Sequence, residues 1–171
     1  MKEISFRNDV LPLKNKLFRL ALRITLNREE AEDVVQDTLM KVWNSRDKWQ
    51  QLESIEAYSL TIARNLSLDR IKKMENQNDS LEEQNTERLD ENTSTPSERM
   101  IQKDKLDIVR NIIDELPEKQ RSCLQLRDIE GKAYKEIANI LSITEEQVKV
   151  NIFRARQTVK QRLQQFDRYG L

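Results

Sequence analysis

The stretch over residues 131–163 constrains this chain more than any other, because its pattern predicts a short helix, a tight turn and a longer helix. Thr144 is expected to cap the longer helix, and Gln147 completes a capping box with it. Apolar residues recur along each helix at a period of about 3.6 residues. They are Tyr134, Ile137, Ala138 and Leu141 in the first helix, and Val148, Ile152, Ala155, Val159 and Leu163 in the second.

Two helices at this spacing can bind duplex DNA. The small side chain of Ala138 lets them approach closely, and Val148 anchors the second helix against the first. The second helix can then lie in a major groove, with its N-terminal side chains at base edges and its basic flank on phosphates. An ordinary helical hairpin with a solvated basic face is the alternative that this stretch alone leaves open.

The composition favours an all-α protein built from small modules. Charged residues make up 35% of the 171 residues, and only 2 glycines and 3 prolines occur. Such a chain has little material for one large core, and it shows no strand-like alternation. The lone Cys123 falls in an apolar helical pattern, so we expect a core thiol in a reducing compartment.

The same composition argues against an enzyme. The chain has no histidine, and with a single cysteine this disfavours a zinc site or a histidine-based catalytic site. No glycine-rich phosphate loop and no nucleophile–base pair is evident, so no catalytic residue, metal ligand or cofactor is expected. The sequence shows no signal peptide or membrane-spanning run, which predicts a cytoplasmic protein.

Charges are segregated along the chain although they sum to zero. Residues 1–73 carry a net charge of +3, residues 74–99 carry −6 and residues 100–171 carry +3. The middle block also contains almost nothing that could pack into a core. We therefore expect two small helical domains, 1–73 and 100–171, joined by an acidic flexible linker over 74–99. Whether the two domains pack against each other is left open.

Apolar periodicity predicts three helices within residues 1–73, or four if the N-terminal one is split. Pro12 suits the first turn of the first helix, and Asn27 and Ser54 are expected to cap the other two. In the third helix the expected apolar side is Tyr58, Ile62, Leu66 and Ile71, and the expected polar side is Arg64, Asn65, Asp69, Lys72 and Lys73.

Residues 100–171 are expected to begin with two helices before the helix-turn-helix. The first runs to Glu115, and the second begins at Pro117. Gly131 is expected to end the second helix in a left-handed conformation.

Three stretches together resemble a known family: AEDVVQDTLMKVW, YSLTIARNLSLDRIKK and ELPEKQRSCLQLRDIEGKAYKEIANILSITEEQVKVNIFRAR. They resemble bacterial RNA polymerase sigma factors of the extracytoplasmic-function group, the minimal members of the sigma-70 family, which retain regions 2 and 4. The resemblance covers nearly the whole chain outside the expected linker and the termini. It implies a C-terminal helix-turn-helix domain of winged-helix-like type, and a subunit that directs promoter-specific transcription initiation.

The resemblance also implies partners. They are core RNA polymerase, at its β′ clamp and its β flap, promoter DNA, and an anti-sigma factor that is often membrane-bound in this group. The AEDVVQDT helix resembles the surface that docks on the β′ clamp, which implies contacts from Asp33, Gln36 and Asp37, with Met40 and Lys41 nearby. A solvated acidic helix face is the alternative for these residues. In the expected linker, the acidic charge either mimics RNA inside the polymerase or keeps a tether extended.

The loop DKWQQLES and the helix after it resemble the part of these factors that recognises and melts the −10 promoter element. An opened strand needs groups that replace lost base stacking. The loop candidates are Trp49, Gln50, Gln51, Leu52 and Ser54, and the helix candidates are Arg64, Asn65, Lys72 and Lys73. Trp49 can equally cap the small core, and Trp43 and Tyr58 are expected to be core residues.

The second helix of the helix-turn-helix resembles the element that reads the −35 promoter box. This implies DNA contacts from Glu146, Gln147, Lys149, Val150, Asn151 and Arg154, with Lys135 on phosphate. The sequence departs from the family pattern at the turn, where Ser142 replaces the usual glycine. Gln147, Val150 and Asn151 replace commoner Thr, Ser and Arg, so the DNA sequence that is read is not predicted.

A free-standing helix-turn-helix repressor or activator is the competing function. It accounts for residues 131–163 but gives no task to the AEDVVQDT helix or to the acidic block. It also predicts a dimer on two half-sites, and no dimerisation stripe is evident.

Overall fold

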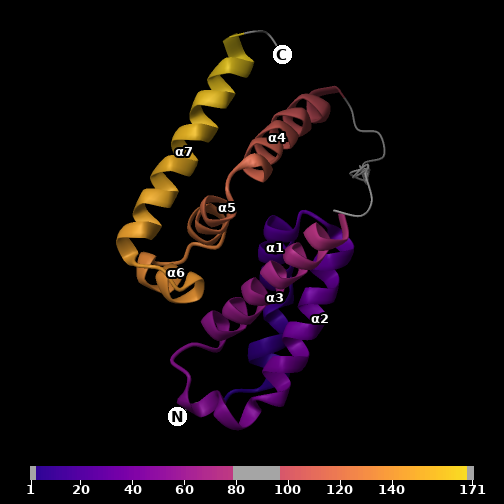
Figure 1. Cartoon of the computed structure of the whole chain (residues 1–171), viewed down its shortest axis with the longest axis vertical. Helices are drawn as coiled ribbons and strands as arrows, with labels where there is room; N and C mark the ends of the chain where they lie inside the picture. Colours follow the sequence, from indigo (N-terminus) through magenta and orange to yellow (C-terminus); the bar gives the residue numbers. More distant parts are fainter. Residues whose placement is uncertain (1–2, 79–96, 169–171) are drawn as a thin grey trace.

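The structure is a computed structural model that describes residues 3–78 and 97–168 (Figure 1). Within these two ranges every regular element is helical and none is a strand, which confirms the predicted all-α class. Most of the expected linker lies outside the described residues. At its two ends the chain is helical, because one helix continues to Asn78 and the next begins at Ser97.

The N-terminal module, residues 3–78, consists of three main helices. They are α1 (Lys14–Thr25), α2 (Arg28–Asn44) and α3 (Ile55–Asn78), with short helical turns at Phe6–Val10, Leu11–Leu13 and Arg46–Gln51. Asn27 caps α2 as predicted, because its side chain accepts a hydrogen bond of 3.0 Å from the Glu30 amide. Ser54 caps α3 in the same way, by accepting one of 3.1 Å from the Ala57 amide.

The C-terminal module, residues 97–168, contains α4 (Ser97–Glu115), α5 (Glu118–Leu124), α6 (Tyr134–Leu141) and α7 (Glu145–Arg168). A π-helical turn, Gln125–Ile129, extends α5, and Gly131 follows at φ +71°, the predicted left-handed conformation. The helix-turn-helix is formed by α6 and α7. The described part of this module contains no β-strand, so its likeness to winged-helix domains is confined to the helices.

The turn between α6 and α7 is built as the sequence predicts. Ser142 takes the left-handed conformation at φ +55°, where a glycine would be less strained. The Thr144 amide donates to the Gln147 side chain over 3.0 Å, and the Gln147 amide donates to the Thr144 hydroxyl over 3.1 Å. This reciprocal pair is the predicted capping box. Ala138 and Val148 are buried where the two helices meet.

The two modules pack against each other and share one apolar core. This core joins buried residues of α1, α2 and α3 to residues of α5, α6 and α7. In Figure 1, α5 and α6 lie beside α1 and α3, and the structure records contacts of α1 with α5 and of α3 with α6. Cys123 is fully buried in the shared core, and burial raises the pKa of its thiol to about 12, which confirms the predicted core thiol.

Helix α3 is buried over a wider surface than the sequence predicts. Its most deeply buried residues are Ser59, Leu60, Ala63, Arg64 and Ser67. The predicted apolar residues Tyr58, Ile62, Leu66 and Ile71 are half-buried and pack against the apolar clusters. The helix is covered on two sides, by α1 and α2 and by α6. Its small hydroxyls can be buried because they bond within the helix, from Ser59 to the Ile55 carbonyl and from Ser67 to the Ala63 carbonyl, each over 2.7 Å.

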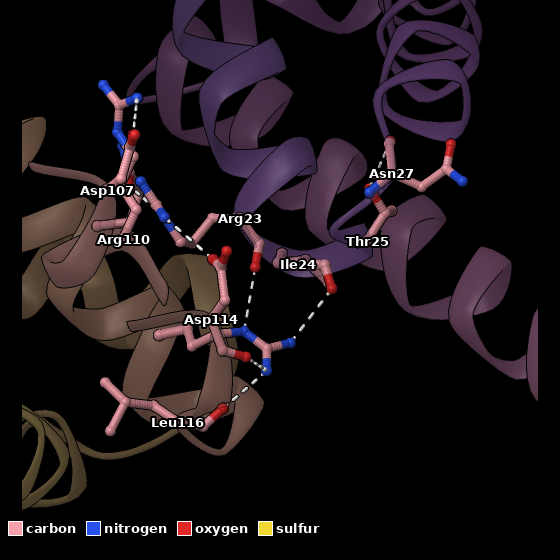
Figure 2. Close-up of polar contacts among 10 residues, drawn as sticks. Arg23, Ile24, Thr25, Asn27, Asp107, Arg110, Asp114 and Leu116 are labelled. Carbon is pink, nitrogen blue, oxygen red and sulfur yellow. Dashed lines mark hydrogen bonds and ion pairs between the residues drawn. The ribbon is translucent and has the colours of Figure 1, made fainter. Parts of the chain in front are cut away.

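Polar contacts reinforce the junction between the modules. Glu130 receives two hydrogen bonds from Arg19, of 2.7 and 2.9 Å. Glu56 of α3 pairs with Lys132 of the C-terminal module at 2.6 Å and with Lys16 of α1 at 2.9 Å. Figure 2 shows a further cluster at the end of α1, where Arg23 and Asp114 form an ion pair at 3.2 Å.

Candidate protein and nucleic-acid interfaces

The residues predicted to dock on a protein partner share one exposed face of α2. Val34, Val35, Thr38 and Val42 are buried on the other side of the helix. The exposed face carries two acids, an amide, a thioether and a lysine, and Met40 is 62% exposed although it is apolar. We call this set the α2 face: Asp33, Gln36, Asp37, Met40 and Lys41.

Arg70 of α3 lies against the α2 face and was not identified from the sequence. Its guanidinium nitrogens lie 3.1 Å from Glu30, 3.1 Å from Asp37 and 3.9 Å from Asp33. Burial alone would lower the pKa of Arg70, but its hydrogen bond to Asp37 and the charges of Glu30, Asp37 and Asp33 raise that pKa overall. No pattern within α3 signals this contact, because it depends on how α3 crosses α2.

The loop between α2 and α3 divides its predicted residues between surface and core. Gln50, Gln51 and Ser54 are exposed, and Leu52 is half-buried. Trp49 is buried, and its indole nitrogen donates a hydrogen bond of 2.9 Å to the Val42 carbonyl. Trp49 therefore completes the core in this structure, as the alternative interpretation held, and has no free ring face for a base.

Trp43 is more exposed than the sequence predicts. It was expected in the core, yet it is 45% exposed at the end of α2. Its ring packs edge-on to Phe6, with centroids 5.3 Å apart, and the Arg46 guanidinium lies 4.5 Å from its centroid. Tyr58 is half-buried and donates from its hydroxyl to Ser45 over 2.9 Å. The exposed aromatic surface beside the loop is thus Trp43.

The four candidates on α3 do not share one environment. Asn65, Lys72 and Lys73 are exposed. Arg64, predicted on the polar side of α3, is buried under the C-terminal module. Its Nη1 donates to the Leu141 carbonyl over 3.2 Å, and its Nε lies 3.4 Å from Glu118 without a hydrogen bond. The C-terminal module occupies Arg64 in this arrangement, so Arg64 cannot contact DNA until the modules separate.

The predicted DNA-reading residues lie together at the start of α7. Glu146, Gln147, Lys149, Val150 and Arg154 are exposed, Asn151 is half-buried, and Lys135 is exposed on α6. Two amide side chains are engaged locally: Gln147 accepts from the Thr144 amide, and Asn151 donates to the Gln147 carbonyl over 2.8 Å. Bidentate readout of adenine by either amide requires these bonds to rearrange.

Tyr134 and Arg127 support this surface and were not predicted to do so. The Arg127 guanidinium lies 4.4 Å from the centre of the Tyr134 ring, and the Lys149 ammonium lies 5.8 Å from it. Tyr134 therefore links the start of α6 to a proposed DNA-contacting lysine of α7. Arg156, further along α7, is paired with Asp128, and its hydrogen bond to that carboxylate raises its pKa.

Metal sites and membrane-spanning helices are absent from the part of the chain that the structure describes. No group of histidine, cysteine, aspartate or glutamate there could hold a metal ion. No helix in residues 3–78 or 97–168 is long and apolar enough to cross a membrane.

Comparison with protein families accounts for both modules. The model for sigma-70 region 2 matches residues 10–76, and the model for sigma-70 region 4 matches residues 106–159. The first range contains the α2 face, and the second contains α6 and α7 as far as residue 159.

Curated relatives extend over nearly the whole chain. The ECF RNA polymerase sigma-E factor of Haemophilus influenzae is 27% identical over 158 residues, which cover 88% of this chain and 83% of the relative. The ECF RNA polymerase sigma factor SigW of Bacillus subtilis is 27% identical over 166 residues, covering 93% and 89%.

Solved structures share the fold. The sigma factor RpoE of Bartonella quintana, solved in complex with the anti-sigma factor NepR, superposes with a TM-score of 0.75 at 23% identity, covering 93% of this chain and 96% of that one. CnrH, solved with the cytosolic domain of CnrY, has a TM-score of 0.64 at 21% identity, covering 91% and 84%. From these matches, the chain belongs to the extracytoplasmic-function group of the sigma-70 family of RNA polymerase sigma factors.

Proposed function

We propose that this sigma factor binds core RNA polymerase through the α2 face and reads duplex promoter DNA through α7. The main support for this proposal is that one chain exposes both surfaces. An acidic helix face lies in the region 2 match, and a basic helix-turn-helix lies in the region 4 match. A sigma factor needs these two surfaces together. The family is a class of initiation subunits rather than of enzymes.

The α2 face is the proposed contact with the β′ clamp. Asp33 and Asp37 supply negative charge for a basic partner surface, and exposed Met40 supplies apolar area between Gln36 and Lys41. A second polymerase contact, with the β flap, is proposed for an apolar groove between α4 and α7. The groove is lined by residues that include Val109, Ile113, Leu124, Ile129, Val159 and Leu163.

The start of α7 is the proposed reader of the −35 box. Its exposed side chains fit the docking geometry of a recognition helix, in which N-terminal residues reach base edges. Lys149 and Arg154 supply positive charge, and Lys135 on α6 is positioned for a phosphate. Base readout is proposed for Glu146, Gln147, Val150 and Asn151.

Recognition of the −10 element is proposed for the loop before α3 and for α3 itself. Gln50, Gln51, Ser54, Asn65, Lys72 and Lys73 are exposed and suit strand and backbone contacts, whereas Leu52 and Trp49 support the loop from within. We add Trp43 as an exposed ring on which a base can stack. Arg64 takes part only after the C-terminal module has left α3.

The remaining partners follow from this assignment. Both structural neighbours were solved with a binding protein, and RpoE was solved with an anti-sigma factor. We propose that an anti-sigma factor holds this chain as well, and that the chain acts in the cytoplasm beside the polymerase. The two family matches together support this function over a free-standing regulator, which would need only the helix-turn-helix.

Reconstitution with bacterial core RNA polymerase tests the proposal. The full chain should bind core polymerase in a pull-down and should initiate transcription at defined positions on a pool of genomic fragments. Asp33→Lys should weaken core binding, and its matched control is Glu32→Lys, a neighbouring exposed acid that lies outside the α2 face and pairs with Arg28. Specific duplex binding without any core binding would instead establish the free-standing regulator.

A further inference from the structure

Three carboxylates surround one guanidinium at the α2 face. Glu30, Asp33 and Asp37 lie on α2, and Arg70 reaches them from α3. Arg70 donates one hydrogen bond to Glu30 and another to Asp37, each over 3.1 Å, and lies 3.9 Å from Asp33. One positive charge thus faces three negative charges, and a net negative charge remains for a partner.

The contacts leave the aspartates accessible. Each recorded contact engages a single carboxylate oxygen of Asp33 or Asp37, and the two side chains stay 57% and 46% exposed. Arg70 itself is less exposed than either aspartate, at 30%. A basic group of a partner can therefore reach both aspartates while Arg70 stays in place.

We propose that Arg70 is a positioning residue for polymerase docking. It holds Asp37 by a hydrogen bond and attracts Asp33 by charge, and it stays in place as their counter-ion when the polymerase binds. The inference rests on the proposed docking role of the α2 face.

Two physical effects make Arg70 favour binding. Without it, three like charges on adjacent turns of α2 repel one another and their side chains spread over several rotamers. A partner would then have to order them at a cost in entropy. Docking also excludes water, and a carboxylate that keeps one charged hydrogen bond during desolvation is less costly to bury than a carboxylate that has none.

The alternative, that Arg70 competes with the polymerase for the aspartates, predicts the opposite change in affinity. If the polymerase had to displace Arg70 before its own basic groups could bind, the arginine would be a competitor. Removing it would then free the aspartates and tighten binding. The sign of the change in affinity therefore distinguishes a positioning residue from a competitor.

The test is a fluorescence titration of the full-length sigma factor with bacterial core RNA polymerase. Arg70→Gln should weaken binding by roughly three- to tenfold, as expected for a partly exposed charged hydrogen bond at an interface. Arg70→Lys keeps the charge but loses the two-pronged geometry, so it should restore part of the affinity. The matched control is Arg28→Gln, an exposed arginine of α2 that pairs with Glu32.

A double-mutant cycle completes the test. If Arg70 acts through Asp37, then Asp37→Asn in the Arg70→Gln background should cost less than Asp37→Asn alone. Unchanged thermal unfolding and unchanged duplex binding through α7 would show that Arg70→Gln leaves the fold intact. Equal or tighter core binding by folded Arg70→Gln overturns the proposal. If Asp33→Asn and Asp37→Asn also leave affinity unchanged with Arg70 present, the docking surface itself is wrong.

Discussion

Arg121, in the C-terminal module, donates a hydrogen bond to the backbone carbonyl of Ile24, in the N-terminal module, over 3.2 Å. That carbonyl is one of the last of α1, which have no partner within their own helix. The same guanidinium donates to the carbonyl of Arg23 over 3.0 Å and to that of Leu116, just past the end of α4, over 2.7 Å. Figure 2 shows these carbonyls converging. One arginine therefore caps two helices from different modules.

Replacing Arg121 should loosen the packing of the modules. Arg121→Ala leaves the carbonyls of Arg23 and Ile24 without their donor and removes a positive charge from two helix C-termini. We expect a larger radius of gyration in small-angle scattering and faster amide exchange at the end of α1. Arg110→Ala is the control, because Arg110 pairs with a neighbour on its own helix, Asp107. Identical scattering from both variants would contradict the capping role.

Acid should weaken the junction through Glu56. Burial alone would raise the pKa of this carboxyl, but the hydrogen bonds and charges of Lys132 and Lys16 lower it below its ordinary value of 4.5. A lowered pKa contributes stability that is present above the unfolded pKa and is lost as the pH falls through the folded pKa. Module packing should therefore hold at neutral pH and weaken below about pH 4.5.

The measurement for Glu56 is the pH dependence of the free energy of unfolding, from urea titrations between neutral pH and acid. Other carboxyls also titrate in this range, so the informative quantity is the difference between the native chain and Glu56→Gln. That difference should be largest at neutral pH and should shrink as the pH falls through the folded pKa. A constant difference would mean that the pairing with Lys16 and Lys132 contributes no pH dependence.

Local signals in the sequence predicted local structure well. The caps at Asn27 and Ser54 and the capping box of Thr144 and Gln147 each involve residues three apart, so a single helix end decides them. The all-α class and the helix-turn-helix followed from periodicity for the same reason. What these signals specify does not depend on how helices are arranged in space.

The errors all arose where two elements meet. Arg64 is predicted on a polar face, but α3 is covered on two sides and the C-terminal module packs over Arg64. Trp43 is predicted in the core, yet Trp49 occupies that place and donates a hydrogen bond to the Val42 carbonyl. The pairing of Arg70 with α2 depends on a helix crossing, which the period of one helix does not contain. Tertiary packing decided these positions.

The register of α7 can be tested with two valines. Val148 is fully buried, whereas Val150, two residues on, is 44% exposed. Val148→Ala should lower the free energy of unfolding by about 1–3 kcal/mol, because it leaves a cavity under the helix-turn-helix. Val150→Ala removes the same atoms from the surface and should change stability by less than about 0.5 kcal/mol. Denaturant titration measures both, and equal losses would mean that the helix is rotated.

Arg64 packs between the modules and is also a proposed −10 contact, and Glu118 allows these two roles to be separated. The two side chains face each other across the junction at 3.4 Å. Arg64→Gln and Glu118→Gln both remove this ion pair, so both should loosen the modules in scattering. In Glu118→Gln the buried Arg64 keeps its charge but loses its carboxylate partner. This disfavours the arrangement in which the two modules pack together.

Only Arg64→Gln removes the proposed contact with the −10 element. In holoenzyme on a promoter found by reconstitution, Arg64→Gln should therefore reduce strand opening, measured as permanganate reactivity of unpaired thymines. Glu118→Gln should open the promoter at least as well as the native chain, because it frees α3 and leaves Arg64 in place. If both variants open DNA equally, Arg64 serves the packing of the modules alone, and the −10 contact on α3 belongs to Asn65, Lys72 and Lys73.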